Sequence, residues 1–191
     1  MTSLDLTIRH ADPGDAAALA ALAARVFRET FGPHNRADDM DAYCSAAFSI
    51  EQQRRELSDH DRYTALAIVR GELAGYAQLH AEPPPPCVTG PHPLELKRLY
   101  VDRRWHGGGV AQALMAHVLE IAQRRGARTL YLSVWKHNRR AIAFYAKHGL
   151  QEVGTAPFWL GSDLQMDPIM MCALPETTSA CSSDSAEFAS H

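Results

Sequence analysis

The sequence has 191 residues, of which 46% are hydrophobic and 21% are charged, and its formal net charge is −3. A chain of this length forms one domain with a complete hydrophobic core, and its slightly acidic balance argues against a nucleic-acid partner, which needs a concentrated basic face. We therefore expect one soluble α/β domain whose charge favours cationic small molecules as partners.

The sequence contains no segment that predicts export or a membrane span. Its longest Ala/Leu run, residues 16–24, is shorter than the ~20 apolar residues that cross a bilayer. Residues 1–11 lack the basic start and apolar centre of a secretory signal. The four cysteines form no CxxC pair and the histidines show no HExxH spacing. We therefore expect reduced thiols, no metal site and a cytoplasmic location.

The N-terminal third begins with a strand and continues as helices. Apolar residues alternate over 4–8, which predicts a strand. Asp12, placed ahead of a proline, predicts a helix start, because its side chain can cap the first turn. The apolar residues keep helical spacing as far as Thr30. Residues 31–63 are predicted to be helical but less regular, with Ser49 at the start of a capping box.

The rest of the chain alternates strands with helices. We expect strands at residues 63–69, 73–79, 94–101, 129–135, 150–157 and 167–174, and helices from Val110 to before Gly126 and at residues 138–148. The prolines of residues 81–93 cannot donate to a sheet ladder and predict a loop. Residues 1–175 are thus predicted to form the domain, and the Ser-rich residues 176–191 a weakly packed tail.

A cluster of three glycines, Gly107 to Gly109, joins the strand at 94–101 to the helix that starts at Val110. A helix N-terminus offers unpaired N–H groups, and glycines let a phosphate approach the backbone closely. A ligand that carries phosphate is therefore the first hypothesis. The alternative is a tight turn that needs glycine only for a positive φ.

Three named glycine motifs do not fit this loop. A Walker A loop needs Lys and Ser or Thr where Val110 and Ala111 stand. A dinucleotide fingerprint needs a third glycine, but Gln112 occupies that position. A lipase needs a nucleophilic serine with glycines two residues to either side, and no serine in the sequence has them. The loop predicts neither a nucleotide-binding protein of these two types nor a hydrolase.

The loop resembles the pyrophosphate signature of the GNAT superfamily of N-acetyltransferases, Gln/Arg-x-x-Gly-x-Gly/Ala, with His106 in the place of Gln or Arg. The family's second pattern, Asn…Ala-Ile-x-Phe-Tyr-x-Lys-x-Gly-Phe, is similar to residues 138–150, with Leu150 in the place of Phe. Residues 158–167, with parts of 30–43, are similar to the spermine/spermidine acetyltransferases of the PaiA type. The resemblance implies an α/β fold with a mixed, largely antiparallel sheet flanked by helices.

The resemblance also implies a reaction and its residues. An acetyl group would move from acetyl-CoA to a primary amine, first of all a polyamine, in a direct ternary complex. The residues implied to bind acetyl-CoA are Leu99, Tyr100, Val101, His106, Gly107, Gly108, Gly109, Val110, Ala111, Gln112, Asn138 and Tyr145. Tyr145 is the implied proton donor to the thiolate, and packing beside Phe144 is the alternative role. Glu95 is the candidate base, and pairing with Lys97 or Arg98 is its alternative role.

Other residues are weaker candidates. The candidates for the amine pocket are Asp163, Asp167 and Tyr43. The candidates for a lid are His80 and His92. The candidates for binding the 3′-phosphate of CoA are Arg103 and Arg104, and the alternative is that these two side chains are merely solvated. Two other functions stay open: an acetyltransferase for a protein, peptide or antibiotic amine, and an acyl-CoA-binding regulator without turnover. We expect a small-molecule amine as partner, no nucleic acid and no membrane, and a homodimer stays open.

Overall fold

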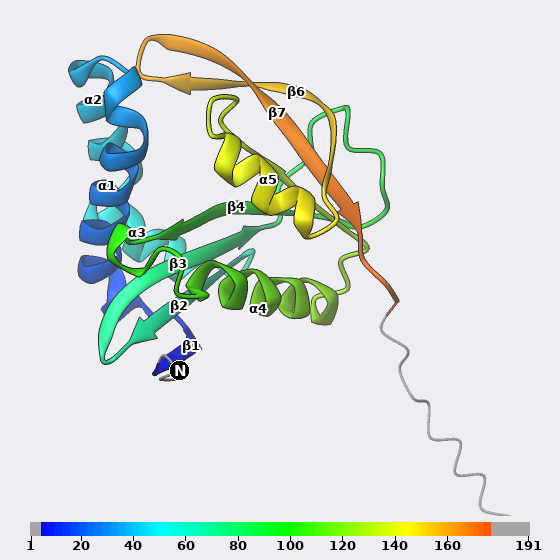
Figure 1. The fold of residues 1–191 in the computed structure, drawn as a ribbon, viewed down its shortest axis with the longest axis horizontal. Coiled ribbons are helices and arrows are strands. Elements are labelled where there is room, and N and C mark those ends of the chain that lie inside the picture. Colours follow the sequence, from blue (N-terminus) through cyan, green and yellow to red (C-terminus); the bar gives the residue numbers. More distant parts are fainter. Residues whose placement is uncertain (1–4, 177–191) are drawn as a thin grey trace, which may run out of the picture.

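A computed structural model describes residues 5–176 as one seven-stranded sheet with helices on both faces (Figure 1). The strands are β1 (Leu6–His10), β2 (Arg62–Val69), β3 (Glu72–His80), β4 (Pro93–Val101), β5 (Thr129–Ser133), β6 (Gln151–Leu160) and β7 (Asp163–Ala173). The α-helices are α1 (Ala16–Phe31), α2 (Ala37–Ala47), α3 (Ile50–Leu57), α4 (Val110–Arg124) and α5 (Arg139–Lys147). The strand order is β1-β2-β3-β4-β5-β7-β6, and only the β4–β5 pair is parallel. The predicted fold class is confirmed.

Local capping fixes where the N-terminal helices begin. The side chain of Asp12 accepts a hydrogen bond from the Gly14 N–H at 2.7 Å, and Asp15 completes a capping box ahead of α1. Ser49 accepts from the Gln52 N–H at 3.2 Å and starts α3. The first strand pairs with β2 over Leu6–His10, so it continues two residues beyond the predicted end at residue 8.

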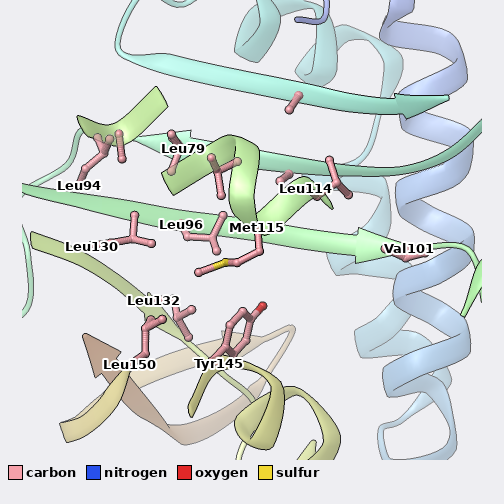
Figure 2. Close-up of a cluster of buried hydrophobic side chains, with 14 of the residues drawn as sticks. Leu79, Leu94, Leu96, Val101, Leu114, Met115, Leu130, Leu132, Tyr145 and Leu150 are labelled. Carbon is pink, nitrogen blue, oxygen red and sulfur yellow. The ribbon is translucent and has the colours of Figure 1, made fainter. Parts of the chain in front are cut away.

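The two faces of the sheet carry separate cores. Helices α4 and α5 cover one face, where Leu114, Met115 and Tyr145 pack on β3, β4 and β5 (Figure 2). Helices α1, α2 and α3 cover the other face, where Phe27 and Tyr76 are buried. The two clusters fill the space between the helices and the sheet on either face.

Strands β4 and β5 separate after a short paired segment. They pair only over Pro93–Glu95 and Thr129–Tyr131. Beyond that point β5 continues against β7, whereas β4 continues to Val101 with β3 as its neighbour. The backbone groups of β4 that face β5 are therefore free of a sheet partner over the last half of the strand. A bulge in the β3–β4 pairing, at Lys97, lies where the strands divide.

The β6–β7 hairpin is longer than the two strands predicted at residues 150–157 and 167–174. Its strands continue to a turn at Gly161, whose φ is +59°. At the tip, the Ser162 N–H and hydroxyl donate to Oδ1 of Asp39 at 2.8 and 3.0 Å. Gln165 Nε2 donates to Oδ1 of Asn35 at 2.8 Å. These contacts hold the tip against α2 (Figure 1), so residues 158–166 extend the sheet.

Two predictions from the sequence concern residues that lie wholly or partly beyond residues 5–176. Most of the tail at 176–191 falls beyond the described residues, as does Cys181. Within residues 5–176 the three cysteines, Cys44, Cys87 and Cys172, are free thiols. In the same range none of the helices combines the length and apolarity needed to cross a bilayer.

Candidate active site

A cleft of about 660 Å³ opens where β4 and β5 separate. Its walls include Val26 and Thr30 of α1 on one face of the sheet and Ala141 and Tyr145 of α5 on the other. Because these helices lie on opposite faces, the cleft passes through the sheet. Two reactants can therefore enter from opposite sides and meet at the open edge of β4.

The residues predicted to bind acetyl-CoA gather in this cleft, with one exception. Those that line it are Leu99, Tyr100, Val101, His106, Gly107, Gly109, Val110, Ala111, Gln112, Asn138 and Tyr145. The exception is Gly108, whose N–H instead donates to the Trp105 carbonyl at 3.2 Å. Strand β4, the glycine turn and helix α5 thus converge although they are separated in sequence.

The glycine turn is shaped by two positive φ angles and remains open on its outer side. Gly107 has a φ of +80° and Gly109 a φ of +86°, and a Cβ at either would meet no atom within 4 Å. Helix α4 starts at Val110, so the N–H groups of its first turn lack intrahelical acceptors. Both hypotheses for the three glycines therefore fit. Glycine permits the positive φ angles of a tight turn, and the turn presents free N–H groups and the positive end of a helix dipole to an anion such as phosphate.

His106 links the end of β4 to α5. Its Nε2 lies 3.0 Å from the Val101 carbonyl oxygen, and its Nδ1 lies 3.0 Å from Nη1 of Arg140. Arg140 also lines the cleft, although nothing in the sequence pattern had pointed to it. A guanidinium at this position adds positive charge beside the open N–H groups.

Tyr145 and Asn138 occupy the α5 side of the cleft. Burial raises the pKa of Tyr145 above its usual value, so its hydroxyl is protonated at neutral pH. Figure 2 shows that hydroxyl directed away from α5, towards β4. Asn138 caps α5 by accepting from the Ala141 N–H at 3.1 Å through Oδ1, and it lines the cleft as well. Asn138 thus fixes the start of α5, and a proton donor is available at Tyr145.

Glu95 does not line the cleft. It is buried on β4, and burial raises the pKa of its carboxyl group. Its Oε2 lies 3.3 Å from Nζ of Lys97, which does line the cleft. The structure thus pairs Glu95 with Lys97, which was its alternative role, and any proton from the cleft would reach Glu95 through that neighbour or a water.

The α1 side of the cleft carries aromatic rings and an arginine whose charge is paired with a carboxylate. Phe31 stands edge-on to Trp135 at a centroid distance of 5.2 Å, and both line the cleft. Arg98, also in the lining, donates to Oε2 of Glu56 at 2.6 Å and lies over the Phe48 ring. The charge of Arg98 is therefore satisfied, and the Phe31 and Trp135 rings contribute aromatic surface to this side of the cleft.

A smaller cavity of about 280 Å³ continues from Trp135 towards the β6–β7 tip, and Asp163 lines it together with His34 and His137. The other candidates for an amine pocket lie elsewhere. Asp167 is buried and accepts from the Lys136 N–H at 3.2 Å. Tyr43 stacks on Phe27 at 4.7 Å.

The remaining candidates have no contact with either cavity. Neither Arg103 nor Arg104 lines the cleft, and Arg104 pairs with Asp102 and Glu72 instead. His92 is exposed before β4 and His80 is buried at the end of β3. Arg104 therefore holds the β4–α4 turn rather than the cleft.

Comparisons with known proteins agree with this geometry. The model of the acetyltransferase (GNAT) family matches residues 21–150. The uncharacterised N-acetyltransferase Rv2669 of Mycobacterium tuberculosis is 35% identical over 158 residues, which cover 82% of this chain and 96% of the relative. An N-acetyltransferase from the pepI 3′ region of Lactobacillus delbrueckii is 29% identical over 154 residues, covering 81% of this chain and 89% of the relative.

A solved structure shares the fold. The crystal structure of PaiA N-acetyltransferase from Thermoplasma acidophilum in complex with coenzyme A superimposes with a TM-score of 0.75 at 20% identity, covering 91% of this chain and 99% of the other. The family model and the sequence relatives each cover most of the chain, and the residues that the family model matches include β4, the glycine turn, α4 and α5. The chain therefore belongs to the acetyltransferase (GNAT) family and is an acetyl-CoA-dependent N-acetyltransferase.

Proposed function

We propose that this enzyme acetylates a primary amine of a polyamine by direct transfer from acetyl-CoA. The observation that carries the proposal is the cleft that passes through the sheet, because it lets acetyl-CoA enter beside α4 and α5 and an amine enter beside α1. No cysteine of the described chain lines the cleft, which favours attack by the amine itself over an acyl-cysteine intermediate.

Acetyl-CoA would be held by the open backbone of β4 and by the glycine turn. Extended ligands add to a free strand edge through main-chain hydrogen bonds, and the edge from Leu96 to Val101 faces the cleft without a sheet partner. The N–H groups of the first turn of α4 suit the pyrophosphate. The thioester would then lie near Tyr145, between the two entrances.

Two residues are proposed for proton transfer. Tyr145 would protonate or hydrogen-bond the departing thiolate, a role that its raised pKa supports because the hydroxyl keeps its proton. Glu95 would accept the proton of the amine through Lys97, which lies between it and the cleft. Neither role needs a metal ion.

A polyamine is favoured by the chemistry of the α1 side. A second ammonium group would lie against Trp135 and reach Asp163 in the adjoining cavity, where cation–π attraction and an opposite charge both act. The net charge of −3 supports the approach of a polycation. The free thiols of the described residues suit a reducing compartment, so we also propose a cytoplasmic location.

The test is release of free thiol from acetyl-CoA with a panel of spermidine, spermine, a lysine-containing peptide, an aminoglycoside and a neutral amine. We expect the polyamines to give the highest kcat/KM. Asp163→Asn should raise KM for spermidine about tenfold and leave KM for acetyl-CoA unchanged, with the exposed Asp38→Asn as control. A preference for the peptide or aminoglycoside would replace the polyamine assignment, and binding of acetyl-CoA without turnover would indicate a regulator.

A further inference from the structure

A row of titratable side chains leads from the α1 side of the cleft to the protein surface. Lys97 lines the cleft, and its Nζ lies 3.3 Å from Oε2 of Glu95. His80 stands directly opposite Glu95 in the β3–β4 ladder. Its Nδ1 lies 3.0 Å from Oε1 of Glu82, whose side chain is 46% exposed. Both ends of the row are exposed: the Lys97 side chain is 40% exposed where it lines the cleft, and Glu82 is exposed at the other end.

The middle of the row is buried and closely spaced. His80 is 4% exposed and Glu95 is 8% exposed. One ring nitrogen of His80 and one carboxylate oxygen each of Glu82 and Glu95 lie within 4.8 Å of one another. Although Glu82 is close to His80, it lies off the line of the ring N–H, so Nδ1 has no hydrogen bond. A small rotation of the exposed Glu82 side chain would make or break that bond.

The reaction requires one proton to leave the cleft in each turnover. An aliphatic amine has a pKa near that of lysine, about 10.4, and so arrives as ammonium. When its nitrogen bonds to the acetyl carbon and the C–S bond breaks, it gives up two protons. One of them ends on the thiol of CoA. The other must reach the solvent.

We infer that His80 and Glu82 carry this proton from Glu95 to the solvent, an inference that rests on the proposed acetylation of an amine. Lys97 gives a proton to Glu95 and is reprotonated by the acceptor ammonium. Glu95 then passes the proton to His80, across a gap that one water or a side-chain rotation spans. His80 passes it to Glu82, and Glu82 releases it to water. Each step breaks one N–H or O–H bond and forms the next.

The surroundings of His80 support transfer in this direction. The charged and titratable groups around it are Arg62 on β2, Asp59 ahead of β2, Glu82 in the following loop, Glu95 and Lys97 on β4, and Tyr131 on β5. Burial lowers the pKa of His80 and raises the pKa of Glu95. The two groups therefore approach each other in proton affinity, which keeps a transfer between them from being strongly uphill.

A bound metal ion is the competing use of the same three side chains. One His and two carboxylates suit a divalent cation. However, Lys97 lies 3.3 Å from Glu95, and Arg62 lies 3.9 Å from Glu82. These cations already neutralise both carboxylates, so a metal would have to displace Lys97. The charge balance favours the proton route.

The experiment compares His80→Gln and Glu82→Gln with His60→Gln, a matched control because His60 is exposed and outside the row. For each variant, kcat is measured by thiol release at saturating acetyl-CoA and amine between about pH 6.5 and 9, with and without added imidazole. We expect His80→Gln to lower kcat about 10- to 100-fold at neutral pH. The loss should shrink as pH rises, because more acceptor arrives as neutral amine, and imidazole should restore turnover.

Glu82→Gln, at an exposed position that tolerates the change, should show a smaller loss with the same pH dependence, and KM for acetyl-CoA should stay constant in both variants. Wild-type kcat in His80→Gln at every pH would overturn the route and leave amine acetylation intact. A loss that neither imidazole nor pH alters would mark a structural role and also overturn it. Zinc binding in calorimetry that His80→Gln abolishes would assign the three side chains to a metal instead. A wild-type enzyme that acetylates no amine would remove both proposals.

Discussion

Arg140 Nη1 donates a hydrogen bond to Nδ1 of His106 across 3.0 Å, which fixes the tautomer of the imidazole. A guanidinium has only donors, so Nδ1 must accept and the ring proton must lie on Nε2. That proton is directed at the Val101 carbonyl oxygen 3.0 Å away. The end of β4 is thereby tied to α5 across the mouth of the cleft.

Arg140→Gln should weaken binding of acetyl-CoA. The substitution removes a positive charge from the lining and one charge-assisted hydrogen bond to His106, and we expect a loss of about 1 kcal/mol, or roughly fivefold in Kd. Arg139→Gln is the matched control, because Arg139 is exposed and lies outside the cleft. Calorimetry with CoA measures both. Equal affinities in the two variants would contradict a role for Arg140 at the cleft.

Gly109→Ala and Gly126→Ala separate backbone strain from ligand contact. Both glycines have positive φ, +86° and +81°, and both have open space where a Cβ would stand, but they lie at opposite ends of α4. Each variant should lose about 1–2 kcal/mol of unfolding free energy. Only Gly109→Ala should also lose affinity for CoA, because its methyl group would project into the cleft. Parallel denaturation and binding experiments test this, and loss of affinity in Gly126→Ala would refute the distinction.

Tyr145→Phe should lower kcat by about 10²- to 10⁴-fold if the hydroxyl protonates the thiolate, while the ring keeps its packing. Tyr63→Phe is the control: its hydroxyl lies 2.8 Å from His117 and outside the cleft, so it should lose about 1 kcal/mol of stability and no activity.

The pH profile adds a second check. Because burial raises the pKa of Tyr145, its loss of a proton should produce no alkaline fall in wild-type kcat below about pH 10. Full turnover in Tyr145→Phe with chemistry rate-limiting would leave Tyr145 a packing residue.

Asp102→Asn should reduce stability in a pH-dependent way. Asp102 is 1% exposed and accepts from Arg25 at 2.7 Å and Arg104 at 3.0 Å. Burial alone would raise the pKa of its carboxyl, but the hydrogen bonds from these arginines outweigh it and hold the pKa well below its usual value. Its contribution is therefore present above the unfolded pKa of about 3.9 and is lost as pH falls below it.

We expect Asp102→Asn to lose about 1–3 kcal/mol near pH 7. Below about pH 4 the difference from wild type should narrow, because the carboxylate of the unfolded wild-type chain takes up a proton there, whereas the folded carboxylate does so only at lower pH. Urea titrations at several pH values measure this, with the exposed Asp38→Asn as control. A gap that stays constant down to low pH would contradict the role of the carboxylate charge.

Local chemistry explains which features were predictable from the sequence. Asp12 before a proline leaves few alternatives to a helix start, and the structure has that cap. The glycine turn was predictable because positive φ at Gly107 and Gly109 restricts the residue type. These signals lie within a few residues, so they do not depend on how distant segments pack.

The α1 side of the cleft was harder to predict because a bulge shifts the alternation along β4. Strict alternation would put Leu94, Leu96, Arg98 and Tyr100 on one face. The bulge at Lys97 shifts the pattern, so Leu99 packs with Leu94 and Leu96 on the α4 side. On the other face, Tyr100 packs with the cluster that includes α1, and Arg98 contacts Glu56 of α3. No local motif predicts the burial of Glu95 beside Lys97. The same holds for the contribution of α1 to the cleft.

The clamp between the β6–β7 tip and α2 has a consequence for how the family can diversify. The Asp39–Ser162 and Asn35–Gln165 contacts bring together the two chain segments beside the smaller cavity, and neither segment includes the glycine turn or α5. Under the proposed function, exchanges in these two segments should therefore retune which amine is accepted and leave the proposed thioester-binding half untouched. Grafting both segments together from a homologue, with their pairing kept, is thus a rational route to an enzyme of altered acceptor choice.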